Sequence, residues 1–475
     1  MSNLDGDWIP GWALGQVEAH RSELAAQAAE RRRLENIALR ANQRHLGIRI
    51  YEVERHKEQL RNHFAIDDIP WEFEKVVGWG HEGIAALIRK REGTGKFRPR
   101  RNYRLVMKRA MTDRGDYRIR HEIGWYRRLH GAEHIANMIS WRDDLAEAAI
   151  PADVATANAT LDVDQLSIRF QHAMRGIFRS PRGRGMFKKK FLDLRKIDDE
   201  LQLLKLAGYP LILIEYLENG TLARLINRIN RFSVPHIPNR LLWSIFLCLV
   251  RACVGMAFPL ERPEPDRLDV MNTQLETYTP GAPIEGGVIH NYLHVGNVMF
   301  GDFNTKHREH RLAPVLKLID FGECLEGEGE TGAYTNMHDV ARLMVALISK
   351  QLQAPVELPR NYGNYHTTAV EIIPSGNGAK YPLLDTDLRD LVARCLAENA
   401  RNRPSLAELL IILERAVVEK TAASYQFPLS TYETDEVVEH FVQHLILDAP
   451  TEADEEARNL EKSEKDRDPV FRIYF

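Results

Sequence analysis

The spacing of apolar and polar positions changes along the chain. Residues 14–64 are rich in Ala, Glu, Arg and Gln, with apolar positions that do not hold a strict heptad. They predict a long helix and leave a coiled coil open. From Trp71, short apolar runs between glycines predict strands, and after Leu217 longer runs predict helices. Beyond Tyr425 an amphipathic segment precedes a charged tail.

These changes predict an α+β fold with extensions on both sides. We expect a helical N-terminal extension over residues 1–66 and a strand-rich unit over residues 67–217. A helical unit follows over residues 218–425, and a helix with a charged tail occupies residues 426–475. Within the strand-rich unit, a polar and basic stretch at residues 142–206 predicts an insertion.

The most apolar stretch, residues 241–260, predicts a buried core helix rather than a membrane span. Arg251 lies at its middle, where a charge inside a bilayer costs about 2.5–3.5 kcal/mol. The start of the chain, MSNLDGDWIPGW, has acidic residues and no apolar core, so it does not read as a secretory signal. We therefore expect no membrane partner.

Composition indicates the cellular compartment of the protein more than its function. The chain has 475 residues, of which 44% are hydrophobic and 28% charged, and its net charge is −3. These values do not point to a nucleic-acid or membrane surface. The four cysteines are scattered without disulfide-framework or metal-ligand spacing, which predicts a reduced intracellular setting, cytoplasmic or nuclear.

The first candidate site residues lie in a glycine-rich turn between two strand-like runs. Gly78, Gly80 and Gly83 form a G-x-G-x-x-G pattern in VVGWGHEGIAALI. Glycines let the backbone approach phosphates and present its N–H groups, although the pattern alone is more typical of a hairpin turn. Because no helix follows, it indicates a flap over a nucleotide rather than a dinucleotide-binding unit.

A lysine and a glutamate follow with complementary charges. Lys108 ends the strand-like run YRLVMK, from where its ammonium could reach phosphates. Ile119, Ile123 and Tyr126 mark the apolar face of the next helix, and Glu122 falls on or beside that face. A carboxylate that points inwards needs a cation, and Lys108 is the natural partner.

Two oxygen ligands for a metal ion lie further along the chain. In PVLKLIDFGE an apolar strand ends at Asp320 before a Gly turn, and Asn297 closes the loop HNYLHVGN. Carboxylate and amide oxygens suit Mg²⁺, a hard ion that also binds phosphate oxygens. The pattern predicts a Mg²⁺ site at these two residues.

In this order, the motifs resemble those of the protein-kinase family over roughly residues 70–420. The glycine pattern matches the Gly-rich loop, Lys108 the lysine of V-A-I-K, Glu122 its helix-C partner, and Asp320 the aspartate of D-F-G. The resemblance implies a bilobal kinase-like fold, with a β-rich N-lobe and a helical C-lobe. It also implies ATP and Mg²⁺ as cofactors.

The resemblance extends to the hinge and the catalytic loop. LILIEYLENGTL is similar to the hinge, which implies that the backbone from Glu215 to Leu217 faces adenine. HNYLHVGN falls on the catalytic loop H-R-D-L-x-x-x-N, which implies a metal-facing role for Asn297. Asp339 is similar to the aspartate that braces this loop from a helix.

The catalytic loop departs from the family at the position of the general base. Tyr292 replaces the aspartate, and a phenol with an ordinary pKa of ~10 cannot replace a carboxylate base near neutral pH. His294 replaces the lysine that contacts the transferring phosphate, and LHVGN is closer to the L-H-x-G-N of aminoglycoside-type phosphotransferases. The segment between Gly322 and Asp339 lacks A-P-E, near which peptide substrates normally dock.

These departures separate nucleotide binding from catalysis. A general base contributes about 10²–10⁴-fold, whereas positioning and Mg²⁺ carry most of phosphoryl transfer. The sequence predicts a pseudokinase or weakly active kinase that binds ATP–Mg²⁺ and a protein partner or substrate. The alternative is an active Ser/Thr-type kinase or small-molecule phosphotransferase with His294 as base.

A weaker alternative concerns nucleic acid. Residues 175–196 contain the basic run RGIFRSPRGRGMFKKKFLDLRK, which could bind nucleic acid or act as a nuclear-import signal. Few aromatic residues accompany the charges, and the bias suits a solvated loop. We therefore expect no nucleic-acid partner.

Overall fold

The structure of the chain is a computed structural model. The described residues are 51–79, 83–91, 104–142, 201, 209–260, 273–278, 287–304, 306–376 and 378–447. Most of the predicted N-terminal extension, nearly all of the insertion and the charged tail lie outside these ranges.

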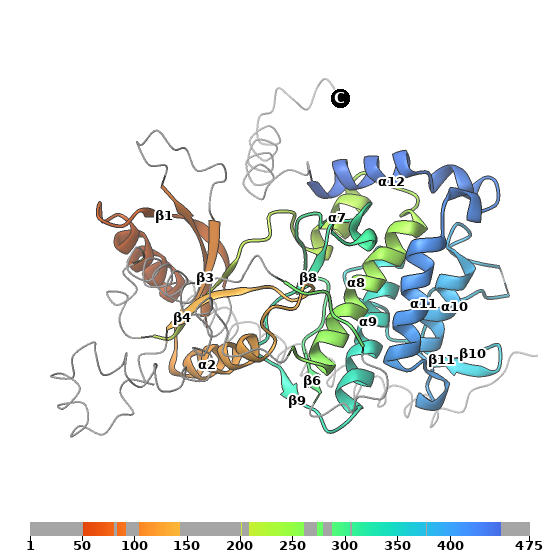
Figure 1. Cartoon of the computed structure of the whole chain (residues 1–475), viewed down its shortest axis with the longest axis horizontal. Coiled ribbons are helices and arrows are strands. Elements are labelled where there is room, and N and C mark those ends of the chain that lie inside the picture. The colour runs from red at the N-terminus through yellow and green to blue at the C-terminus, as the bar shows by residue number, and fades with distance from the viewer. Residues whose placement is uncertain are drawn as a thin grey trace, which may run out of the picture.

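The first part of the described chain forms a five-stranded antiparallel sheet with the order β1-β2-β3-β5-β4. Its strands are β1 (Trp71–Trp79), β2 (Gly83–Lys90), β3 (Arg104–Ala110), β4 (Met138–Arg142) and β5 (Leu211–Glu215). Helix α2 (Asp113–Arg128) follows β3, and residues 51–64 form a helix before β1. Figure 1 shows these elements gathered at one end of the molecule.

Alternation along β3 separates the two faces of the sheet. Leu105 and Met107 are buried in one core cluster with Phe64 from the helix before β1. Successive side chains of a strand point to opposite faces, so Val106 and Lys108 lie on the other face. This alternation directs Lys108 away from the first helix.

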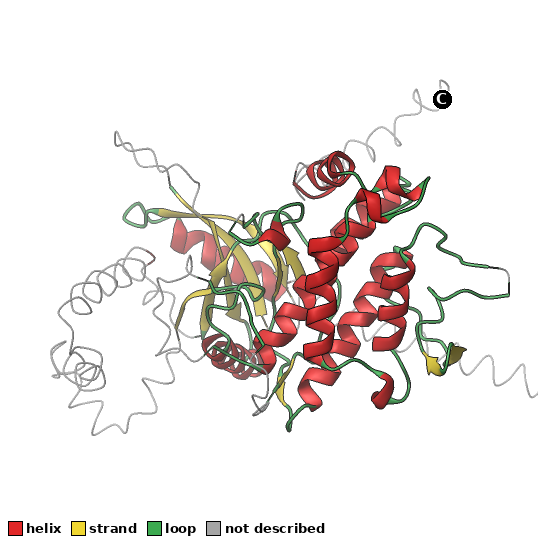
Figure 2. Cartoon of the chain, turned by 45° about the vertical axis from the view of Figure 1, so that its right-hand side comes forward, coloured by secondary structure: helices red, strands yellow, loops and turns green. Residues whose placement is uncertain are grey.

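The rest of the described chain is mostly helical (Figures 1 and 2). Its helices are α7 (Leu222–Arg231), α8 (Asn239–Ala257), α9 (Thr331–Ser349), α10 (Thr386–Cys395), α11 (Leu406–Glu419) and α12 (Asp435–Val442), which the π-helical turn η8 (Gln443–Leu447) continues. Short antiparallel pairs join β6 (Val288–Ile289) to β9 (Leu325–Glu326), β7 (Val298–Phe300) to β8 (Leu316–Leu318), and β10 (Arg360–Tyr362) to β11 (Tyr365–Thr367). Turns of 3₁₀ helix lie at η4 (Arg308–His310), η5 (Ala400–Asn402), η6 (Ala422–Ser424) and η7 (Leu429–Tyr432).

The apolar stretch predicted as a core helix forms α8, and every residue of α8 except Arg240 is buried. Among the described helices, only α8 is long and apolar enough to cross a membrane, and 94% of its apolar window is buried within the protein. Arg251, at its middle, pairs with Glu309 at 2.6 Å and with Glu414 at 2.8 Å. These ion pairs explain how the core accommodates a charge.

The fold is α+β, with an antiparallel sheet followed by a mostly helical region, and the sequence prediction is confirmed at this level. One core cluster contains buried side chains of α2, α8, α9 and α11. The two parts therefore share a continuous core, and the predicted site residues come from both of them.

Candidate functional site

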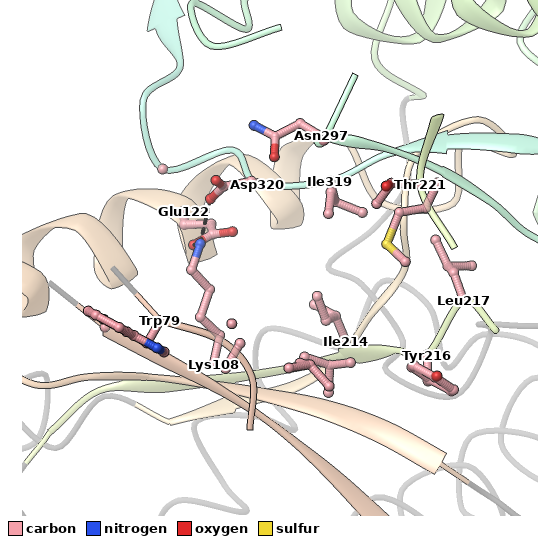
Figure 3. A pocket seen from close by; sticks show the side chains of 18 of the residues that line it. Trp79, Lys108, Glu122, Ile214, Tyr216, Leu217, Thr221, Asn297, Ile319 and Asp320 are labelled. Atoms are coloured by element: carbon pink, nitrogen blue, oxygen red, sulfur yellow. Dashed lines mark hydrogen bonds and ion pairs between the residues drawn. The ribbon is translucent and has the colours of Figure 1, made fainter. Parts of the chain in front are cut away.

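The side chains of Lys108, Glu122 and Asp320 meet in space and are called the Lys108 triad below (Figure 3). Lys108 Nζ lies 2.6 Å from Oε2 of Glu122 and 2.5 Å from Oδ1 of Asp320. Only 2% of the Glu122 side chain is exposed, whereas Lys108 and Asp320 are partly exposed. The predicted pairing of Lys108 with Glu122 is confirmed.

The Lys108 triad shifts the pKa of each of its members. Burial alone would lower the pKa of Lys108, but the carboxylates of Glu122 and Asp320 outweigh burial and raise it above its ordinary value. Burial raises the pKa of Glu122, and Lys108 offsets this only in part. Burial would also raise the pKa of Asp320, but the ammonium outweighs it and lowers the pKa. Asp320 is therefore a carboxylate and Lys108 an ammonium at neutral pH.

The turn after β8 holds Asp320 in place. Its backbone φ is +67°, in the left-handed region that non-glycine residues rarely adopt. The next residue, Phe321, is fully buried, and its ring lies 5.0 Å from those of Tyr126 on α2 and His290. This packing anchors the turn to α2, so that Asp320 stays beside Lys108.

A cavity of about 650 Å³ opens beside the Lys108 triad. Its apolar lining residues include Val77, Val106, Ile214, Leu217, Met299 and Ile319. Figure 3 shows Leu217 and Tyr216 at the far end of the cavity from Glu122. A pocket of this volume suits a small organic ligand.

The structure describes two of the three predicted loop glycines. Gly78 and Gly83 line the cavity, and Gly80 lies outside the described residues. A Cβ at Gly83 would lie 2.9 Å from the carbonyl oxygen of Arg109 on β3, whereas a Cβ at Gly78 would meet nothing within 4 Å. Strand pairing therefore requires glycine at position 83. The approach of this loop to a phosphate stays a prediction.

Glu215 and Leu217 both line the cavity. The Glu215 carboxylate is already occupied, because its Oε1 accepts from Lys317 Nζ at 2.6 Å and from the Asn137 backbone N–H at 2.7 Å. Among the described residues, no backbone hydrogen bond uses the N–H or the carbonyl of Leu217. Leu217 can thus offer one donor and one acceptor to a ligand.

Asn336 on α9 braces the loop HNYLHVGN, and the sequence prediction of Asp339 for this role is wrong. The His290 N–H donates to Asn336 Oδ1 at 2.9 Å, and Asn336 Nδ2 donates to the Val288 carbonyl at 2.6 Å. Asp339, about one turn later, lies 3.4 Å from Nδ1 of His338. An amide can both donate and accept, whereas a carboxylate only accepts. The two backbone groups therefore need an amide.

Asn336→Ala should lower the free energy of unfolding by about 2–4 kcal/mol, because it leaves two buried backbone groups without partners. Urea unfolding followed by tryptophan fluorescence measures the change. Asp339→Ala is the matched control on the same helix, and its loss should stay below about 0.5 kcal/mol. Equal losses in the two variants would contradict the assignment of the brace to Asn336.

Tyr292 lines the cavity with 53% of its surface exposed, and its ring packs edge-on against His294. Nδ1 of His294 accepts a hydrogen bond from the Gly296 N–H at 3.0 Å. Burial lowers the pKa of His294, so the ring is neutral at pH 7 with its proton on Nε2. In this tautomer Nε2 is a donor. The predicted base role of His294 stays a prediction, and it would require the proton to move.

Asn297 and Asp320 offer two oxygen ligands to a cation. Asn297 Nδ2 donates to the Tyr292 carbonyl at 3.0 Å, which leaves Oδ1 for a metal ion. The Ile319 N–H donates to the Asn297 carbonyl at 3.0 Å, so Asn297 lies next to the turn that holds Asp320. The Lys108 ammonium donates to Oδ1 of Asp320, so Oδ2 is available to a metal ion. These oxygens could hold Mg²⁺.

The sequence pattern does not single out every residue of the site. Met299 and Ile319 line the cavity close to the predicted residues Asn297 and Asp320. Met299 lies in β7, two residues after Asn297, and alternate positions share a face; Ile319 directly follows β8 and precedes Asp320. Comparison of the chain with protein-family models and with curated proteins finds no match.

Proposed function

We propose that this chain is a protein-kinase-like domain that binds ATP–Mg²⁺ and acts as a pseudokinase or weakly active kinase. The Lys108 triad beside a largely apolar cavity of about 650 Å³ carries the proposal. In this proposal the sheet region corresponds to the N-lobe of a bilobal fold, and the helical region to the C-lobe. The order of the motifs along the sequence supports the same assignment.

The adenine ring, the phosphates and Mg²⁺ would each contact described residues. The apolar walls suit the adenine ring, and the backbone groups of Leu217, which no backbone group of the described residues uses, suit its hydrogen-bonding edge. Lys108, held by Glu122, would contact the phosphates as a point charge. Asn297 and Asp320 would hold Mg²⁺, which neutralises phosphate charge when it is bound.

The same site is poorly equipped for phosphoryl transfer. Tyr292 occupies the position where the family carries a carboxylate base. The donor at Nε2 of His294 suits contact with a phosphate, as expected of the lysine that it replaces. This tautomer supports the pseudokinase proposal over the alternative of an active phosphotransferase.

The basic run at 175–196, on which the nucleic-acid alternative rests, lies outside the described residues.

Asp320→Asn should remove most of the Mg²⁺-dependent stabilisation by ATP. A ligand that binds only the folded state stabilises it by about 2.7 kcal/mol at 100 times its Kd. The parent should therefore melt higher in ATP with Mg²⁺ than in ATP with EDTA, as differential scanning fluorimetry can measure. The variant keeps an acceptor for Lys108 but loses the charge that attracts the cation.

Asp302→Asn is the matched control for this measurement, because Asp302 is exposed and does not line the cavity. Its melting shift should equal that of the parent. A parent without any shift, or an Asp320→Asn variant with the full shift, would contradict the proposed nucleotide site.

A further inference from the structure

Three side chains of types that commonly bind metals meet in the core, and none of them lines the cavity beside the Lys108 triad. His134 lies between α2 and β4, Cys248 at the middle of α8, and His310 at the end of η4. All three are buried, and one ligand atom of each lies within 4.8 Å of the other two. Cys248 Sγ is 3.9 Å from Nδ1 of His310. These residues are called the His134 cluster below.

Glu276 fixes the orientation of His134. Its Oε1 accepts the His134 backbone N–H at 2.7 Å, and its Oε2 lies 2.6 Å from Nδ1 of the ring. A carboxylate only accepts, so Nδ1 carries a proton, and Nε2 is the nitrogen that a neutral ring leaves for a metal ion. Nε2 is buried, and Cys248 is a close neighbour of the ring. Such a carboxylate partner is typical of a histidine that binds a metal.

We propose that His134, Cys248 and His310 bind a Zn²⁺ ion as three of its four ligands. Thiolate sulfur and imidazole nitrogen are the ligands that zinc prefers, at about 2.3 Å and about 2.0–2.1 Å. A tetrahedral ion at these lengths separates sulfur from nitrogen by about 3.5 Å, close to the 3.9 Å between Cys248 and His310. A solvent molecule would complete the coordination. Mg²⁺ and Ca²⁺ prefer oxygen ligands and do not suit this set.

The charges of the His134 cluster balance around such an ion. Zn²⁺ with one thiolate and two neutral imidazoles carries one positive charge, which the Glu276 carboxylate offsets. Arg251 donates to the Glu276 carbonyl at 2.7 Å, and its own charge is paired with Glu309 at 2.6 Å. A neutral group of charges is tolerated in a core, whereas an unpaired one is costly.

The ion would link segments that are distant in sequence and that contact the strand leading to Asp320. The Leu318 N–H donates to the His134 carbonyl at 2.9 Å, and the Ala136 N–H donates to the Leu318 carbonyl at 2.9 Å. Leu318 ends β8, which continues into the turn that holds Asp320. The metal would therefore hold this strand against α8. Zinc binding at this cluster would not require a nucleotide.

Metal binding releases protons from its ligands, so Zn²⁺ would displace the proton of the Cys248 thiol.

Metal analysis of the full chain tests the proposal. Protein purified without a histidine tag and dialysed against Zn²⁺ and then buffer is measured by inductively coupled plasma mass spectrometry. We expect about one zinc per chain in the parent and in Cys253→Ala, and little in Cys248→Ala. Cys253 is the matched control, because it is buried on the same helix outside the cluster. A zinc-free parent, a different metal in its place, or zinc retained by Cys248→Ala would overturn the assignment.

If Cys248→Ala does not fold, two further measurements test zinc binding by the His134 cluster. The parent loaded with Co²⁺ should show a thiolate-to-cobalt charge-transfer band, and a spectrum without this band would overturn the proposal. Glu276→Gln should weaken zinc binding by about 10–100-fold, measured by competition with a chromogenic chelator. Unchanged affinity in this variant would contradict the role given to Glu276.

Discussion

Lys108→Met is expected to lose about 3–5 kcal/mol of unfolding free energy relative to the parent. The change removes the ammonium that lies 2.6 Å from Glu122, and only 2% of that glutamate side chain is exposed. The carboxylate then keeps its desolvation cost and loses its attraction. Glu122→Gln in the same chain should recover most of the loss, because an amide carries no charge. Equilibrium unfolding in urea measures all of these variants.

Lys57→Met is the matched control for this stability change. Lys57 pairs with Glu54 at 3.0 Å on the helix that precedes β1, where both side chains are partly exposed. Its loss should stay below about 1 kcal/mol. A loss this small for Lys108→Met would contradict a stabilising role for the ion pair with Glu122. Nucleotide binding is best compared in Lys108→Met/Glu122→Gln, where a loss does not come from unfolding.

Tyr292→Asp should raise the rate of γ-phosphate transfer from ATP by about 10²–10⁴-fold, the usual contribution of a general base. Tyr292 is 53% exposed and lines the cavity, so a shorter side chain leaves the core intact. The carboxylate can accept a proton from an attacking hydroxyl, while Lys108, Asn297 and Asp320 stay in place. Transfer to water or to the protein itself is measured with γ-labelled ATP under single-turnover conditions.

Tyr292→Phe is the control for this rate change, because it keeps the ring and removes only the hydroxyl. Its rate should match that of the parent. A parent that transfers phosphate as fast as Tyr292→Asp would contradict the interpretation that a base is missing. A large loss on His294→Ala in such a parent would favour the alternative in which His294 acts as base.

The pairing of Lys108 with Glu122 could be predicted because each residue follows a local pattern, whereas the contact of Lys108 with Asp320 was not predicted. Alternation along β3 places Lys108 on the face opposite Met107. Glu122 falls beside the apolar face of α2 that carries the buried Ile123. Asp320 ends an apolar run before a glycine turn. Periodicity therefore placed Lys108 and Glu122 on faces that can meet, and Asp320 was predicted only as a metal ligand.

The loop brace and the His134 cluster could not be predicted in this way. Asn336 and Asp339 lie about one turn apart on α9, and tertiary packing decides which of them reaches the loop. Cysteine spacing detects metal ligands that are close in sequence, whereas His134, Cys248 and His310 come together only through the packing of α8. The spacing of the cysteines therefore did not indicate the group that these three residues form.

Isothermal titration calorimetry of the parent with ATP tests the proposed nucleotide site most directly. We expect a single saturable binding event that requires Mg²⁺ and is absent in Lys108→Met/Glu122→Gln. A folded parent that shows no binding of ATP in the presence of Mg²⁺ would contradict the central proposal.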